Sequence, residues 1–133
     1  MIIRLSYAFV FLLAVACGPT FAATIRVPQD HTTIQAAIDA TAAGDTVLVA
    51  AGTYRERLRL KENVAMRSAG DDAKGKLGLK RAEATIIDGS GKEGDGPGIA
   101  MAEGATLDGF TVTNVGMYNE AEWNKHHATH GND

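Results

Sequence analysis

The apolar and polar positions of the chain alternate in short runs, which predict strands. Residues 24–27 alternate in this way, and Pro28 ends the run. Further runs of strand length lie at residues 46–50, 57–60, 63–68, 84–89 and 105–115, with Gly, Asn or Asp residues between them. Residues 69–83 and 89–98 are charged or rich in glycine, so we expect surface loops there.

One segment has helical spacing instead. Its inward positions recur three and four residues apart, at Ile34, Ala37, Ile38 and Thr41. Thr32 and Gln35 form a capping-box pair, so Thr32 is the predicted N-cap, and Gly44 is the expected stop. A helix of about 11 residues is marginal alone, so its apolar stripe must rest on the strands.

Two of the predicted strands resemble each other. "ATIIDG" and "ATLDG" place Asp88-Gly89 and Asp108-Gly109 20 residues apart. A repeat of this length indicates a solenoid, and no helix fits between the two copies. We therefore expect an all-β coil of short parallel strands, one turn per repeat.

The first 22 residues have the layout of a secretory signal peptide. Arg4 precedes an apolar run at residues 7–16, and small residues follow it. Thr20 and Ala22 fit the cleavage site, so we expect cleavage after Ala22 and a secreted or periplasmic protein. The alternatives are a lipoprotein anchored at Cys17 and a buried N-terminal helix. The run is too short to span a membrane in the mature chain.

The net charge of the chain restricts the kinds of partner that we expect it to bind. The whole chain has a net charge of −3, and removal of Arg4 with the leader makes it more negative. The sequence has no basic patch, so we expect no nucleic acid partner.

The order of these motifs carries a family resemblance. "TIQAAIDATAAGDTVLVAAGTYRERLRL", "ATIIDGSG" and "GFTVTN" resemble the N-terminal part of secreted right-handed parallel β-helix proteins of the pectin-lyase-like superfamily, which include probable pectate lyases. The resemblance covers residues 24–115. It implies that the helix caps the first rung, with Ile34 and Ile38 over Val47 and Val49, and that residues 52–54 form the corner into the next strand.

The resemblance also implies a role at extracellular polysaccharide. Catalytic residues of the family lie on later rungs, so we assign none here. If the protein is an enzyme, a polysaccharide lyase or glycoside hydrolase is expected. The alternative is a non-enzymatic structural or carbohydrate-binding β-helix protein. Two to four rungs fit residues 23–115. We expect either a truncated coil or an open edge that pairs with another chain.

Three polar residues of the predicted coil are candidates for metal binding or for a structural hydrogen bond. Asp88 and Asp108 would stack about 5 Å apart on neighbouring rungs and could bind Ca²⁺ together. The alternative is that each aspartate caps its own Gly turn through backbone amides. Asn114 could bond to the backbone of the next turn, which is a structural role.

The polar tail, residues 116–133, has an unusual composition. His126 and His130 would share one helix face and could bind Zn²⁺ with Glu122 as a third ligand. Tyr118 and Trp123 could stack on sugar rings. The alternative is a poorly ordered loop.

Overall fold

The computed structural model describes residues 21–90 and 96–115. Within these residues the chain is mostly β-strand, with two short helices. The strands are β1 (Thr24–Val27), β2 (Thr46–Val49), β3 (Gly52–Tyr54), β4 (Leu58–Arg59), β5 (Ala65–Ser68), β6 (Thr85–Asp88), β7 (Ile99–Ala100), β8 (Thr106–Asp108) and β9 (Thr111–Thr113), and the helices are α1 (Ile34–Asp39) and α2 (Lys80–Ala84).

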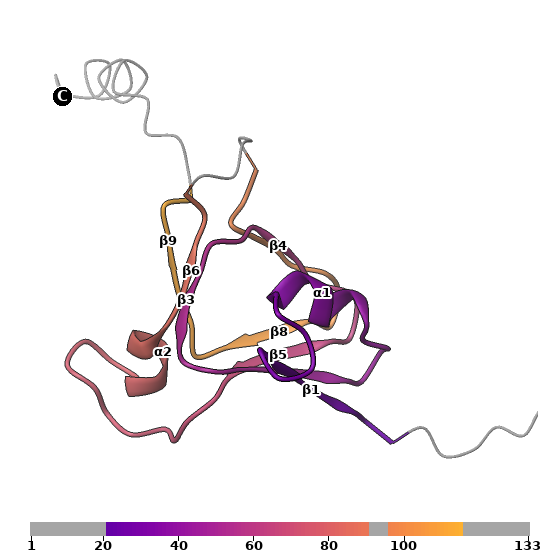
Figure 1. Cartoon of the computed structure of the whole chain (residues 1–133), viewed down its shortest axis with the longest axis horizontal. Helices are drawn as coiled ribbons and strands as arrows, with labels where there is room; N and C mark the ends of the chain where they lie inside the picture. The colour runs from indigo at the N-terminus through magenta and orange to yellow at the C-terminus, as the bar shows by residue number, and fades with distance from the viewer. Residues whose placement is uncertain (1–20, 91–95, 116–133) are drawn as a thin grey trace, which may run out of the picture.

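The strands form three parallel sheets. Sheet A has the order β1-β2-β5-β8, sheet B has β3-β6-β9, and sheet C pairs β4 with β7. Figure 1 shows the sheets as the three sides of a triangle around a common interior. From β2 onward the chain passes through sheets A, B and C in that order, returns to A, and repeats the sequence.

The register of the strands places apolar side chains in rows that face the interior. In sheet A, Ile25, Val47, Met66 and Leu107 lie opposite one another in successive strands. Val47 and Met66, in the middle of this row, are fully buried, whereas Leu107 on the last strand is partly exposed. Alternation of inward and outward side chains along each strand therefore builds the core row by row.

A corresponding row fills the interior from sheet B. Tyr54, Ile87 and Val112 are opposite one another in β3, β6 and β9. Ile87 is fully buried, and Val112 on the last strand is 37% exposed. The core is thus complete around the middle strands and open at β8 and β9 within the described residues.

Helix α1 lies across the opening of the triangle and contacts β1, β2 and β4 (Figure 1). Its stripe of Ile34, Ala37 and Ile38 is fully buried in one cluster with Val47 and Val49. The prediction that the helix covers the first core residues is confirmed.

The predicted capping box and helix length were wrong. The N-cap is Thr33, whose hydroxyl oxygen accepts the Ala36 N–H at 3.2 Å. The helix has six residues because it tightens at its end, where the Thr41 N–H and hydroxyl both donate to the carbonyl of Ile38, at 3.0 and 2.6 Å. The expected stop at Gly44 falls in the turn after the helix.

Two side chains join α1 to the strands. The Glu56 carboxylate accepts the N–H groups of Ile34 and Gln35 at 2.9 and 3.1 Å, so it satisfies two free donors at the helix start. The Gln35 side chain accepts the Arg59 N–H at 2.8 Å and donates to the Arg59 carbonyl at 3.2 Å. Gln35 therefore pairs with the free edge of β4 as a neighbouring strand would, and does not complete a capping box.

Other predictions needed correction. Residues 52–54, expected as a corner, form strand β3, which pairs with β6. The expected single strand at residues 105–115 is divided into β8 and β9 at Gly109, where φ is +81°. Helix α2 begins inside the expected loop at 69–83. No helix in the described part of the chain has the length and apolar character needed to cross a membrane.

Candidate functional site

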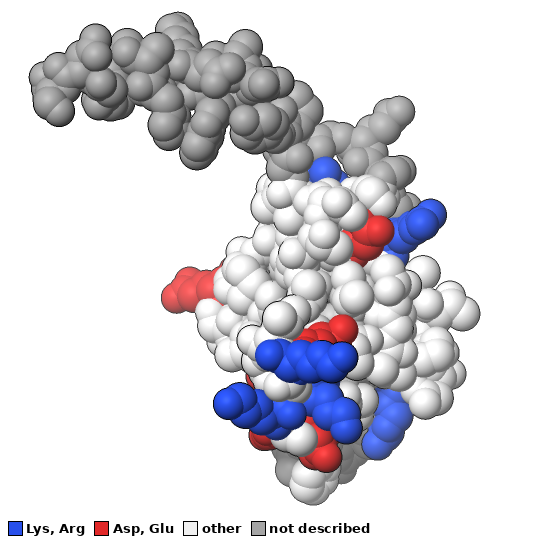
Figure 2. All heavy atoms as spheres, turned by 90° about the vertical axis from the view of Figure 1, so that its left-hand side faces the viewer, with Lys and Arg blue, Asp and Glu red and all other residues white. Residues whose placement is uncertain are grey.

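The segment between β5 and β6, residues 69–84, stands outside the three sheets and ends in α2 (Figure 1). Figure 2 faces this side of the molecule and shows Lys and Arg side chains gathered around acidic ones on its lower part, where this segment lies. We call residues 69–84 the charged segment.

Backbone and carboxylate bonds shape the charged segment. Lys74 and Leu79 form an antiparallel bridge, and the Gly75 N–H donates to the Gly78 carbonyl at 2.7 Å. The Glu83 carboxylate accepts the N–H groups of Leu77 and Gly78 at 2.5 and 3.0 Å. The amide of Leu77 contributes most to holding the pKa of Glu83 below its ordinary value. The segment is therefore a closed, hydrogen-bonded loop.

Arg81 fixes this loop to sheet A. Its side chain is only 4% exposed. A buried guanidinium is costly unless its N–H groups find hydrogen-bond acceptors. Nη1 donates to the Ser68 hydroxyl at 3.0 Å and to the Asp108 carbonyl at 2.9 Å. Nη2 donates to the Asp108 carboxylate at 2.7 Å, and Nε donates to Asp72 at 2.8 Å. Four bonds to three residues thus compensate for the burial.

A second arginine completes an ion-pair network. Arg67 lies opposite Asp108 in the ladder and pairs with its carboxylate at 2.6 Å and with Asp72 at 3.1 Å. The hydrogen bond to Asp108 raises the pKa of Arg81, and the hydrogen bond from Arg81 lowers the pKa of Asp72. Both carboxylates are therefore held by both arginines.

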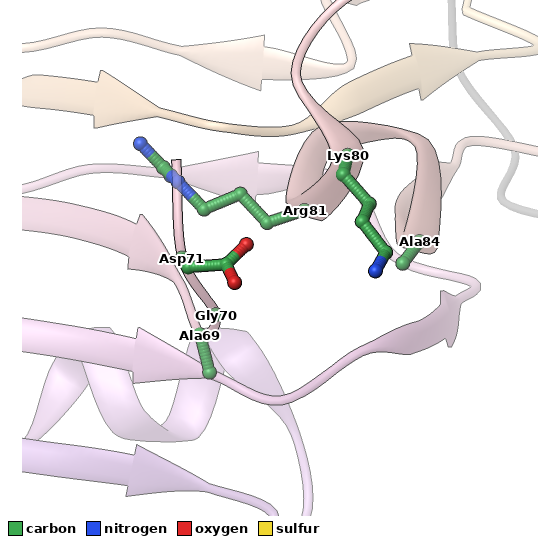
Figure 3. Close-up of a pocket in the computed structure, with 6 residues that line it drawn as sticks. All are labelled: Ala69, Gly70, Asp71, Lys80, Arg81 and Ala84. Carbon is green, nitrogen blue, oxygen red and sulfur yellow. The ribbon is translucent and has the colours of Figure 1, made fainter. Parts of the chain in front are cut away.

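A pocket of about 270 Å³ lies beside this network. It is lined by Ala69, Gly70, Asp71, Lys80, Arg81 and Ala84. Figure 3 shows Asp71 and Lys80 on opposite sides of this space, with the Arg81 side chain extending away from Lys80. Neither Asp71 nor Lys80 makes an ion pair within the described residues. We call this the Lys80 pocket.

A larger and more apolar hollow, of about 530 Å³, lies on the other side of α2. Leu77, Leu79 and Ala82 line it from the charged segment, and Ile86 and Thr111 line it from the outer face of sheet B. Leu77 is 95% exposed. The charged segment therefore borders two recesses, of which the Lys80 pocket is the more polar, with α2 between them.

The Lys80 pocket provides one cation and one carboxylate with free bonding capacity. An ammonium can donate hydrogen bonds to a carboxylate or hydroxyl of a ligand, and a carboxylate can accept hydrogen bonds from hydroxyls. Most glycoside hydrolases place a pair of carboxylates around the bond that they cleave, whereas Asp71 is the single carboxylate among the described residues that line this pocket. The pocket is suited to binding.

The predicted stacking of Asp88 and Asp108 was wrong. Asp88 lies in sheet B opposite Thr113, and Asp108 lies in sheet A opposite Arg67. The sequence repeat thus places the same motif in two different sheets. In the part of the chain that the structure describes, no three His, Cys, Asp or Glu side chains are grouped as metal ligands.

Asp88 and Asn114 have a structural relationship instead. The Asp88 carboxylate accepts the Asn114 side-chain N–H and the Ser90 backbone N–H, each at 2.9 Å. The bond from Asn114 contributes most to lowering the pKa of Asp88. The predicted turn-capping role of the aspartate holds for Asp88, whereas Asp108 is bound by arginines. Within the described residues the side-chain amide of Asn114 bonds to the Asp88 side chain, and the next turn, to whose backbone it was expected to bond, lies outside them.

The remaining predicted site residues lie outside the described residues. These are His126, His130 and Glu122 for the metal site, and Tyr118 and Trp123 for sugar stacking.

Sequence reasoning missed Arg81 and the Lys80 pocket. Apolar periodicity detects only the inward rows, and residues 69–83 have the composition of a solvated loop. The one available signal is the Lys80-Arg81 pair, which lies shortly before the strand pattern at residues 84–89, and such pairs are common in loops.

Comparisons with known proteins gave no relative. No family model matches the chain, and the searches of curated proteins and of solved structures found no match. The fold and the Lys80 pocket therefore rest on their own geometry.

Proposed function

We propose that residues 23–115 are the cap and first rungs of a right-handed parallel β-helix, as in pectin-lyase-like proteins. The support is the repeated passage of the chain through sheets A, B and C, with in-register parallel strands in each sheet. The proposed hand follows from the strong preference of crossovers between parallel strands for the right-handed form.

The proposed function of this fold is binding of an extracellular acidic polysaccharide at the Lys80 pocket. The observation that carries the proposal is the position of Lys80 and Asp71 on opposite sides of an open pocket, with neither side chain in an ion pair within the described residues. Lys80 would bind a uronate carboxylate, and Asp71 would accept a ring hydroxyl. The adjacent apolar hollow extends the surface available to a polymer.

Binding is favoured over cleavage by these residues. Beside the pocket, Asp72 and Asp108 are acceptors in the arginine network, and Glu83 accepts backbone amides. A carboxylate committed in this way is a poor general acid or nucleophile. Asp71 is the remaining carboxylate of the pocket lining, and one carboxylate does not make the pair that most glycoside hydrolases use, so hydrolysis would require residues outside this site.

The test measures binding of the full chain to polygalacturonate, with a neutral glucan as comparison. Lys80→Gln should weaken binding to polygalacturonate several-fold, and added salt should reduce the wild-type affinity. Lys74→Gln is the matched control because Lys74 is exposed on the same segment and does not line the Lys80 pocket. Equal affinities for Lys80→Gln, Lys74→Gln and wild type would refute this site.

A second measurement separates binding from elimination. Incubation with polygalacturonate, with and without Ca²⁺, reports unsaturated product by its ultraviolet absorbance. We expect no rise above the buffer control. A rise that persists in Lys80→Gln would show a lyase with its active residues elsewhere in the chain.

A further inference from the structure

Ala23 is the first residue of the described chain whose backbone is held in place. Its N–H donates to the Asp45 carboxylate at 2.8 Å, and its carbonyl accepts the Thr46 N–H at 2.8 Å. Phe21 and Ala22 before it are exposed, Phe21 by 86%. The boundary between the exposed and the anchored chain therefore lies at the peptide bond between Ala22 and Ala23.

Asp45 is a well-placed acceptor at this boundary. It is 9% exposed, and its second oxygen accepts the Ala42 N–H at 2.8 Å. The bonds from Ala42 and then Ala23 hold the pKa of Asp45 below its ordinary value, so it is ionised at neutral pH. The nearest cation is Lys61, but its ammonium bonds to the carbonyl oxygens of Asp39 and Thr41. Within the described residues Asp45 has no direct ion-pair partner.

The space around Asp45 is large enough to hold a chain terminus at residue 23. A hollow of about 460 Å³ lies over Asp45, between residues 21–23 on one side and residues 42–45 on the other. Removal of residues 21 and 22 would open this hollow to water without disturbing the bonds of Ala23 to the turn.

We propose that Ala23 is the N-terminal residue of the mature protein and that its α-ammonium forms an ion pair with Asp45. A processing peptidase hydrolyses the Ala22–Ala23 amide: the C–N bond breaks, water supplies the hydroxyl that makes the Ala22 carboxylate, and the Ala23 nitrogen takes up protons to become an ammonium. The nitrogen already lies 2.8 Å from Asp45, so the ion pair needs no rearrangement of the fold.

The proposal gives processing a structural consequence. In the precursor the donor at position 23 is a neutral amide, whereas in the mature protein it is a cation beside a nearly buried carboxylate, and charged hydrogen bonds are stronger than neutral ones. Lipoprotein processing at Cys17 would leave residues 17–22 attached, and the donor would stay neutral. The two processing routes thus predict a different charge on the Ala23 nitrogen that bonds to Asp45.

The first experiment determines the N-terminus. The full chain is expressed in a secreting bacterial host, and the exported protein is characterised by intact mass and N-terminal sequencing. We expect the chain to begin at Ala23. A chain that begins at any other residue, or that carries lipid on Cys17, overturns the proposal.

The second experiment tests the ion pair in the processed protein. Selective acetylation of the α-amino group removes its charge and leaves every side chain unchanged. We expect acetylation to lower the folded-to-unfolded ratio several-fold in wild type and in Asp30→Asn, and to have no effect in Asp45→Asn. Asp30→Asn is the matched control because its carboxylate accepts a backbone N–H of the same strand, from Arg26, without contacting Ala23.

Asp45→Asn also weakens the bond to Ala42, so this variant can fail to fold. In that case the ion pair is tested by comparing the stability of the free and acetylated forms of the wild-type protein. Equal stability of the free and acetylated forms of wild type refutes the ion pair.

Discussion

The guanidinium of Arg81 fills the space that a side chain at position 109 would need. A Cβ at Gly109 would lie 1.8 Å from Nη1 of Arg81 and 2.4 Å from the Ser68 hydroxyl. Gly109 also has φ of +81°, which other residues adopt at a cost. The glycine between β8 and β9 is therefore required both by the backbone and by the buried arginine.

We expect Gly109→Ala to destabilise the protein through both effects. Overpacking costs about 1–3 kcal/mol, and the left-handed backbone adds about 1 kcal/mol for alanine. Gly44→Ala is the control for the backbone effect, because φ there is +93° and no atom lies within 4 Å of the added Cβ. Chemical denaturation should rank Gly109→Ala as more destabilising than Gly44→Ala. Equal losses would show that Arg81 moves aside freely.

Arg81→Met should loosen the charged segment from sheet A. The change removes the bonds from Arg81 to Asp72, Asp108 and the Ser68 hydroxyl, and Arg67 alone then bonds to the two carboxylates. Hydrogen exchange should accelerate in residues 69–84, and the midpoint of thermal unfolding should fall. Lys80→Met is the neighbouring control on the same helix and should change neither measurement much. Equal exchange in the two variants would mean that Arg81 does not anchor the segment.

Acid should weaken the same segment. The hydrogen bond from Arg81 lowers the pKa of Asp72, and the Leu77 amide lowers that of Glu83. A carboxylate whose pKa is lower in the folded state stabilises above its unfolded pKa, and this stabilisation is lost as the pH falls through the folded pKa. The thermal midpoint should therefore be steady above about pH 5 and fall below about pH 4.

The variants Asp72→Asn and Glu83→Gln test the source of this acid sensitivity. Each variant removes one of the carboxylates whose pKa is lowered. The thermal midpoint should therefore fall less between neutral and acidic pH than it does in wild type. Slopes identical to that of wild type would assign the acid sensitivity to other groups.

Two adjacent isoleucines should respond differently to truncation. Ile87 is fully buried and lies in the inward row between Tyr54 of β3 and Val112 of β9. Ile86, the residue before it, faces outward and lines the apolar hollow. Ile87→Ala should cost about 2–5 kcal/mol of unfolding free energy, as in other buried positions. Ile86→Ala should cost less than about 1 kcal/mol. Urea denaturation of both variants measures the difference, and similar losses would contradict the inward register of β6.

The sequence was informative about the parts of the fold that bury apolar side chains. The stripe of Ile34, Ala37 and Ile38 identified α1, and alternation identified β1, β2, β5 and β6. Strand β3 was missed because it begins at Gly52, a residue that weakens strand propensity and favours turns. Its pairing with β6 is a long-range contact, which local patterns do not report.

The candidate site was less accessible to sequence reasoning. The similarity of "ATIIDG" and "ATLDG" suggested that Asp88 and Asp108 are equivalent, but the intervening chain places them on different sheets. Arg81 and Asp108 are 27 residues apart, and their contact depends on the path of the charged segment. Spacing alone cannot show such a contact.

The bond between Glu56 and the start of α1 has a consequence for the order in which the domain is assembled. The acceptor for the Ile34 and Gln35 amides comes 22 and 21 residues after them in the chain. During synthesis from the N-terminus, the helix therefore emerges before the group that completes its first turn. Helix α1 is therefore synthesised early, but its N-terminal hydrogen bonds can form only after Glu56, which follows β3, has been synthesised.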